Sequence, residues 1–223
     1  FVADYISLIE NKMKKPIILI STKNWSESLE FAKGRKCDIL SSAMWTKERE
    51  REFIFTKSYI DIPLVLLTKN GTSFINNLSS IKNKKVSIVE DYAILEILKN
   101  KYKDIEFVTV KNVDEGLEKV LKNEVFGHID AISTAWYKLQ TKYLTQLSIS
   151  AKLDEVSKLS IAVRSDDSTL YEILQKAVWS IDDFVKDDLL NKWLSVEYKK
   201  DFDYSVLWKI FLVLSVIFIA VIY

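Results

Sequence analysis

The side chains with the clearest chemical potential lie in the stretch SSAMWTKEREREFIFTKSYI, residues 41–60. The chain has four arginines, and two of them, Arg49 and Arg51, are here. A guanidinium is a planar fork of donors that suits a carboxylate, and Thr46 can cap a short helix that carries Arg49 in its first turn. Arg49 is therefore a candidate clamp for an acidic or amino-acid ligand. The alternative is a solvated charged turn, which is the commoner role of such charge runs and the one expected for Arg51.

The composition narrows the classes of function. A net charge of +1, with 28% charged residues, provides no basic surface for nucleic acid. A single histidine, His128, argues against a His-based metal site or a catalytic triad. A single cysteine, Cys37, allows no internal disulfide. We expect no cofactor, no metal and no nucleic-acid partner.

Helical and strand patterns alternate along the chain, which predicts an α/β fold with largely parallel pairing in mixed sheets. In such sheets ligands bind at the carboxyl ends of strands. Residues 41–49, 89–92 and 129–131 lie at such ends. The expected helices span 4–13, 24–34, 92–102, 112–123, 132–142 and two segments within 168–194, and the expected strands span 37–43, 63–69, 85–90, 105–110, 125–130 and 159–164.

The C-terminal stretch VLWKIFLVLSVIFIAVIY, residues 206–223, is almost entirely apolar. As a helix it would extend about 27 Å, close to the thickness of a bilayer core. We therefore predict a transmembrane helix over 205–223 behind a short linker, 199–204; the alternative is a buried C-terminal helix. At the other end, helical periodicity already runs at Tyr5, so the chain is expected to be a fragment that starts upstream.

The order of residues in 41–60 resembles family 3 of the bacterial solute-binding proteins. Their pattern of T-P-E-R followed by F-S/T-x-P-Y is matched by Thr46-Lys47-Glu48-Arg49 and by the segment 53–59, FIFTKSY. The resemblance extends over about residues 2–198. It is carried by further segments, which are DYISLIENKM, WSESLEFAKGRKCDIL, PLVLLTK, GHIDAISTAWY and SIAVR.

The resemblance implies a two-lobed flytrap, in which the chain crosses from one lobe to the other and returns, and ligand binds between the lobes. Lobe 1 would comprise residues 1–66 and 160–198, and lobe 2 residues 67–159. By this resemblance Arg49 matches the arginine that holds a ligand carboxylate, and Asp130 matches the acid that meets a ligand amino group. A helix N-cap is the alternative role for Asp130.

The same resemblance implies further ligand-lining positions. Ser42 and Met44 match positions of the first lobe, and Asp91 and Tyr92 match a loop of the second. Trp45, between Met44 and the arginine turn, is a further candidate. Two departures stand out, because Asp91 replaces a frequent glycine and Met44 replaces a frequent threonine. The remaining tryptophans, including Trp25, are expected to serve packing.

A flytrap followed by a membrane helix resembles the sensor domains of membrane-bound histidine kinases and diguanylate cyclases. We therefore expect a membrane-anchored sensor with residues 1–204 periplasmic or extracellular, a small amino-acid-like ligand, and a homodimeric receptor. Two alternatives remain open: a membrane-tethered binding protein of an amino-acid transporter, and a degenerate flytrap that binds no small molecule. An enzyme on the same fold is disfavoured, because the chain shows no paired-carboxylate site.

Overall fold

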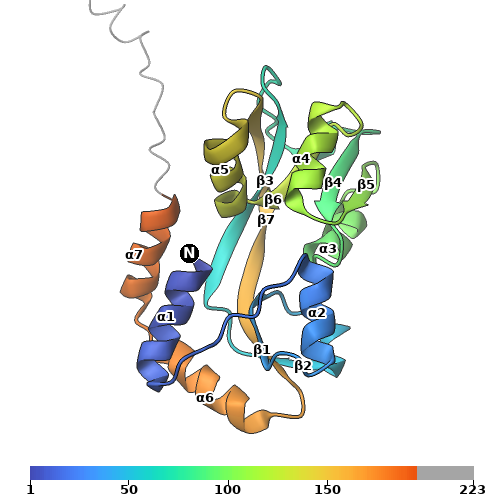
Figure 1. Cartoon of the computed structure of the whole chain (residues 1–223). Helices are drawn as coiled ribbons and strands as arrows, with labels where there is room; N and C mark the ends of the chain where they lie inside the picture. Colours follow the sequence, from blue (N-terminus) through green and yellow to red (C-terminus); the bar gives the residue numbers. More distant parts are fainter. Residues whose placement is uncertain (195–223) are drawn as a thin grey trace, which may run out of the picture.

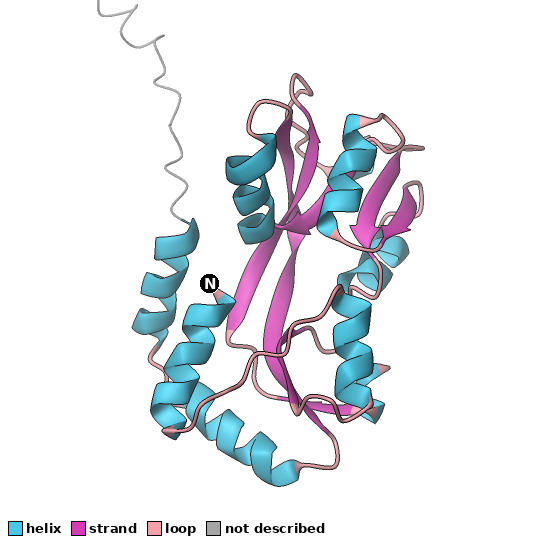
Figure 2. Cartoon of the chain, in the orientation of Figure 1, coloured by secondary structure: helices cyan, strands magenta, loops and turns pink. Residues whose placement is uncertain are grey.

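A computed structural model describes residues 1–194 of the chain. Strands run through the middle of the molecule, and helices lie on either side of them (Figures 1 and 2). Within residues 1–194, no helix is both long and apolar enough to cross a membrane. The predicted linker, 199–204, and the predicted membrane helix, 205–223, lie outside the described residues.

The elements alternate as the sequence predicts. The helices are α1 (Val2–Met13), α2 (Trp25–Lys33), η1 (Arg49–Arg51), η2 (Leu78–Ser80), α3 (Ile94–Lys101), α4 (Val113–Leu121), α5 (Ile132–Lys138), η3 (Leu139–Tyr143), α6 (Ser168–Trp179) and α7 (Asp183–Leu194). The strands are β1 (Ile39–Ala43), β2 (Phe53–Phe55), β3 (Ile60–Lys69), β4 (Lys85–Val89), β5 (Glu106–Val110), β6 (Gly127–Ala131) and β7 (Leu147–Arg164). The strand order is β1-β7-β3-β6-β4-β5, and β2 pairs with β7.

Lobe 1, in the lower half of Figure 1, contains α1, α2, α6, α7, β1, β2 and the adjoining ends of β3 and β7. The amphipathic helix α1 buries Tyr5 and Ile9, one turn apart, against α6 and the sheet. The Tyr5 ring stacks on that of Tyr59 with 4.0 Å between the ring centroids. This stacking fixes the segment that leaves the arginine turn and enters β3.

Lobe 2, in the upper half of Figure 1, contains β4, β5, β6, α3, α4, α5 and the other ends of β3 and β7. Strand β4 pairs in parallel with both β5 and β6. The side chain of Asn112 accepts a hydrogen bond of 2.9 Å from the backbone of Glu115 and so caps the N-terminus of α4. Helix α3 buries Ile94 and Leu98 in the lobe 2 core, so the loop before α3 is held at the interlobe edge.

The two lobes are joined by the long strands β3 and β7. They pair antiparallel from Ile60 opposite Leu159 to Lys69 opposite Leu147. Both strands run from one lobe into the other (Figure 1). This arrangement agrees with the predicted crossing and return of the chain, while the predicted lobe boundaries, 1–66 with 160–198 and 67–159, stay predictions.

Two expectations about the sheet were wrong. The pairing is not largely parallel, because β1, β2 and β3 pair antiparallel with β7, and β3 pairs antiparallel with β6. The return strand begins at Leu147, not at 159. Leu147, Ala151 and Leu153 are buried while Lys152 and Asp154 are exposed, so one side of this strand faces solvent and its pattern is less apolar than that of 159–164.

Candidate functional site

Arg49 lies in the 3-10 turn η1, directly after β1, and is half-buried. Its backbone N–H donates to the Thr46 hydroxyl at 3.2 Å, so the predicted capping contact is present. Its Nη1 donates to the Met44 carbonyl at 2.8 Å within lobe 1, and its Nη2 donates to the Asp91 carbonyl of lobe 2. Burial lowers the pKa of Arg49 below its ordinary value, with the charge of Asp91 opposing the shift. Arg51 is exposed, as predicted.

Two residues of α2 converge on the same Asp91. The indole Nε1 of Trp25 donates to the Asp91 carbonyl at 3.1 Å, and the hydroxyl of Ser26 donates to the Asp91 carboxylate. The Arg49 guanidinium lies 5.5 Å from the centre of the Trp25 ring, within cation–π range. Trp25 therefore contributes to the interlobe contact as well as to packing. Sequence reasoning missed Trp25 and Ser26, because their partner lies 66 and 65 residues away in the chain.

Asp91 has a left-handed backbone, with φ of 59°. Most residues with a Cβ avoid this conformation, whereas glycine adopts it freely and aspartate is among the tolerated exceptions. The frequent glycine at this position in the resembled pattern thus has a backbone explanation. Its replacement by Asp91 adds a carboxylate at the interlobe edge without changing the turn.

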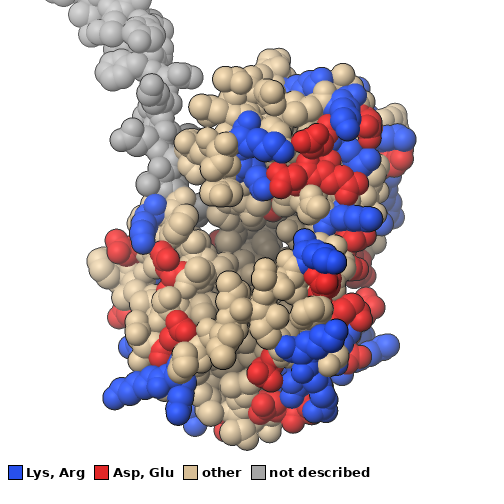
Figure 3. Space-filling view, viewed as in Figure 1, with Lys and Arg blue, Asp and Glu red and all other residues tan. Residues whose placement is uncertain are grey.

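A pocket of about 550 Å³ opens between the lobes beside this contact. Lobe 1 contributes α2, the arginine turn and Phe53, and lobe 2 contributes the residues from Asp91 into α3. Among the predicted ligand-lining residues, Arg49, Asp91 and Tyr92 line it, whereas Asp130, Ser42, Met44 and Trp45 are not part of its lining. Figure 3 also shows a hollow between the two lobes on the viewed face.

Asp130 lies at the end of β6 and is 2% exposed. Its Oδ1 accepts a hydrogen bond of 2.6 Å from the backbone of Ala131, and within residues 1–194 its Oδ2 has no hydrogen-bond partner. It does not cap α5, since that helix has no side-chain cap bond at its N-terminus. The charge of Asp130 is the largest cause that raises the pKa of Tyr92, with burial adding to it. Tyr92, which lines the pocket, therefore lies within electrostatic range of Asp130.

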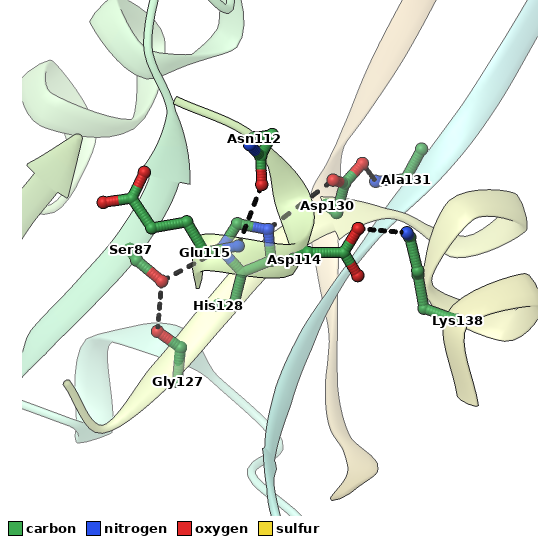
Figure 4. A network of polar contacts seen from close by, with 9 residues as sticks. All are labelled: Ser87, Asn112, Asp114, Glu115, Gly127, His128, Asp130, Ala131 and Lys138. Carbon is green, nitrogen blue, oxygen red and sulfur yellow. Dashed lines mark hydrogen bonds and ion pairs between the residues drawn. The ribbon is translucent and has the colours of Figure 1, made fainter. Parts of the chain in front are cut away.

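A second buried polar group supports Asp130 from the side of the sheet (Figure 4). His128 is fully buried, and its Nε2 lies 3.6 Å from Oδ2 of Asp130. Its Nδ1 lies 2.9 Å from the hydroxyl of Ser87 on the neighbouring strand β4. Strand alternation predicts His128 and Asp130 on one face, and this contact confirms it. Gly116 of α4 packs on the His128 ring, and a Cβ there would collide with that ring.

The remaining predicted residues occupy different surroundings. Met44 packs against the lobe 2 core cluster that contains Ile88 and Leu98, so it contacts the opposite lobe. Ser42 is half-buried in β1. Trp45 is 53% exposed, and its Nε1 donates to the carboxylate of Glu50 at 2.8 Å. The indole therefore contacts the neighbouring arginine turn of the same lobe. In residues 1–194, no group of three or more His, Cys, Asp or Glu side chains could hold a metal ion.

Comparison with known proteins assigns this two-lobed chain to a family. The family model described as bacterial extracellular solute-binding proteins, family 3, matches residues 1–196. The chain belongs to this family. The identification agrees with the resemblance in residues 41–60, and it makes the space between the lobes the place to look for a solute.

Proteins similar to this chain include a sensor and an amino-acid-binding protein. The virulence sensor protein BvgS of Bordetella pertussis is 19% identical over 192 residues, covering 86% of this chain but only 16% of BvgS. The crystal structure of the BvgS periplasmic VFT2 domain matches with a TM-score of 0.79 at 19% identity, covering 86% of this chain and 82% of that one. An ancestral arginine-binding protein bound to glutamine matches with a TM-score of 0.75 at 19% identity, covering 86% of each chain. These matches confirm the predicted α/β flytrap fold.

Proposed function

We propose that this domain is an extracytoplasmic sensor that binds a small solute bearing an amino group between its lobes and signals through the predicted membrane helix, 205–223. The observation that carries the proposal is Asp130, a buried carboxylate with one oxygen that lacks a hydrogen-bond partner within residues 1–194. Burying a charge without a partner is costly, so such groups in native proteins call for a functional explanation. A ligand ammonium would supply the missing partner.

The packing of α7 supports the signalling half of the proposal. Helix α7 contacts both α1 of lobe 1 and α5 of lobe 2. Its last turn is tied to α1, because Lys192 and Trp193 each donate to the Asp4 carboxylate at 2.9 Å. A change in the angle between the lobes would therefore alter the contacts of α7, the last described helix before the predicted membrane segment. A ligand can shift that angle only by its difference in affinity for the two arrangements.

The proposal is tested by a thermal-shift screen of the protein with amines, amino acids and small carboxylates. We expect compounds with an amino group to raise the melting temperature of the wild type and not that of Asp130→Asn. Asp187→Asn is the matched control, because Asp187 is exposed on α7. Stabilisation that persists in Asp130→Asn would overturn the assignment of Asp130.

The second candidate function is a flytrap that senses something other than a small solute. The specific observation in its favour is that lobe 1 already holds lobe 2 through direct hydrogen bonds to Asp91. A folded protein that no compound of the screen stabilises would favour this candidate. The alternative of a membrane-tethered transport protein differs from the proposed sensor only in its protein partners. Co-purification of this chain with a permease would identify that alternative.

A further inference from the structure

The Asp91 loop receives three side-chain donors from the opposite lobe. They are Nη2 of Arg49 and Nε1 of Trp25, which share the carbonyl, and the hydroxyl of Ser26, which binds the carboxylate. Asp91 lies on a loop, and its donors lie in the arginine turn and at the start of α2, where Trp25 also packs against the lobe 1 core. The contacts therefore bear on how the lobes meet more than on how each lobe folds.

We propose that Asp91 is a built-in occupant of the Arg49 subsite, so that the lobes close without a ligand carboxylate and the site selects amines over the corresponding amino acids. This inference rests on the proposed function for its ligand half, since it names the class of solute that meets Asp130. Its conformational half, closure of the unliganded lobes, stands on the Asp91 contacts alone.

The guanidinium geometry is the first support. A carboxylate is held best when it accepts two parallel N–H bonds from one arginine. In this protein both terminal nitrogens of Arg49 donate to backbone carbonyls, one of Met44 and one of Asp91. The Trp25 ring centre lies 5.5 Å from the guanidinium carbon. The Asp91 carbonyl therefore competes with a ligand carboxylate for Nη2 of Arg49.

The backbone of Asp91 is the second support. Its φ of 59° is left-handed, and the residue lies in the turn that follows β4, outside the strand ladder. Its carbonyl is the shared acceptor of Arg49 and Trp25. The carboxylate of Asp91 faces Ser26 on the same side, so one residue of lobe 2 presents two acceptors to lobe 1.

The charge distribution is the third support. Asp91 adds a negative charge beside Arg49, which disfavours a second carboxylate there. At Asp130, by contrast, an acceptor oxygen is still without a hydrogen-bond partner within residues 1–194. Asp130 therefore favours a cationic group of the ligand, and the surroundings of Arg49 disfavour an anionic one. A primary amine or guanidine without a carboxylate fits this demand.

The conformational half is tested by spin-label distances between the lobes. Labels are placed by Lys36→Cys on lobe 1 and Lys122→Cys on lobe 2, both exposed, in a Cys37→Ser background. We expect the unliganded protein to show one narrow distance distribution. Trp25→Phe with Ser26→Ala removes two donors and keeps the aromatic ring, and we expect it to raise the open fraction about tenfold. Lys47→Ala, at an exposed residue outside the pocket lining, is the matched control and should leave the distribution unchanged.

Equal open fractions in the unliganded protein and in the Trp25→Phe, Ser26→Ala variant would overturn the proposed closure. Because Trp25 is partly buried against the lobe 1 core, a loss of fold is checked by far-ultraviolet circular dichroism. Should the double variant not fold, Ser26→Ala alone serves, with a smaller expected shift in the same direction.

The ligand half is tested with decarboxylated pairs as probes: agmatine with arginine, cadaverine with lysine, and tyramine with tyrosine. We expect the amine that stabilises the protein best to act at about tenfold lower concentration than its amino acid, and this ratio to narrow in the Trp25→Phe, Ser26→Ala variant. Equal or stronger stabilisation by the amino acids would overturn the selectivity. Closed lobes without stabilisation by any amine would instead refute the proposed ligand function and leave the closure intact.

Discussion

The two proposed charged contacts of the ligand, Arg49 and Asp130, are built in opposite ways. Arg49 lies in an irregular turn, is half-buried, and donates to carbonyls of both lobes. Asp130 lies at the end of a central strand, is 2% exposed, and keeps one oxygen without a hydrogen-bond partner within the described residues. The difference teaches that the protein itself supplies acceptors to Arg49, whereas Asp130 keeps one oxygen for which the proposed function supplies a partner from outside.

Gly116→Ala probes the support of the acidic end and should have the largest effect on stability. The added Cβ would collide with the fully buried His128 ring, which contacts both Ser87 and Asp130. We expect the free energy of unfolding to fall by about 3 kcal/mol, as for overpacked cores. Urea denaturation followed by circular dichroism measures it. An unchanged midpoint would mean that His128 is not held tightly beneath Asp130.

Asp130→Asn should have the next largest effect on the free energy of unfolding. It is expected to stabilise the protein, whereas most substitutions destabilise one. Because the amide is uncharged and nearly isosteric, it removes the cost of burying a carboxylate that lacks a second partner. We expect the unliganded protein to gain about 2 kcal/mol in free energy of unfolding. Thermal and urea unfolding both measure it. A loss of stability would show that Asp130 is already satisfied within the protein and would remove the contrast between the two ends.

Substitutions of Asp91 test the contact of Arg49 with lobe 2, because they alter the backbone conformation of the residue whose carbonyl accepts from Arg49. Valine is strained at φ of 59°, whereas glycine adopts that conformation freely. We expect Asp91→Val to cost about 1–2 kcal/mol in free energy of unfolding. Asp91→Gly should change it by less than about 0.5 kcal/mol, because relief of strain offsets the lost Ser26 bond. Equal effects of the two substitutions would show that the left-handed turn does not govern the interlobe contact.

Ser26→Ala should give the smallest change. Its hydroxyl bonds the carboxylate of Asp91, which is an exposed residue, so water can replace the contact. We expect a loss of about 0.5 kcal/mol, and none in an Asp91→Gly background, where the acceptor is absent. A double-mutant cycle with denaturant measures the coupling. Additive losses would contradict the bond.

Local patterns predicted much of the fold. The alternating elements and the two helices after 168 follow from apolar periodicity, which relates residues only a few positions apart. The start of β7 at Leu147 was missed, because its exposed half carries polar residues. The antiparallel pairing of β3 with β7 was missed as well, because strand direction depends on tertiary contacts and not on local spacing.

The candidate site was predictable only where one segment carries it. The bond from Arg49 to Thr46 lies within a single turn, so residue spacing predicts it. The fork of Arg49, in contrast, is directed by Asp91, which lies 42 residues along the chain in the other lobe. Trp25 and Ser26 lie 66 and 65 residues from Asp91, and this separation hid their roles as well. Contacts of this kind are determined by how two lobes meet, which no short stretch of sequence specifies.

The most direct test of the central claim, that a solute amine meets Asp130 between the lobes, is a nitrogen-15 spectrum of the His128 ring. His128 is the single histidine of the chain, and its Nε2 lies 3.6 Å from Oδ2 of Asp130. We predict that the amine which best stabilises the protein shifts the ring signals of His128, while acetate at the same concentration does not. An amine that stabilises the protein but leaves those signals in place would bind elsewhere and would contradict the assignment.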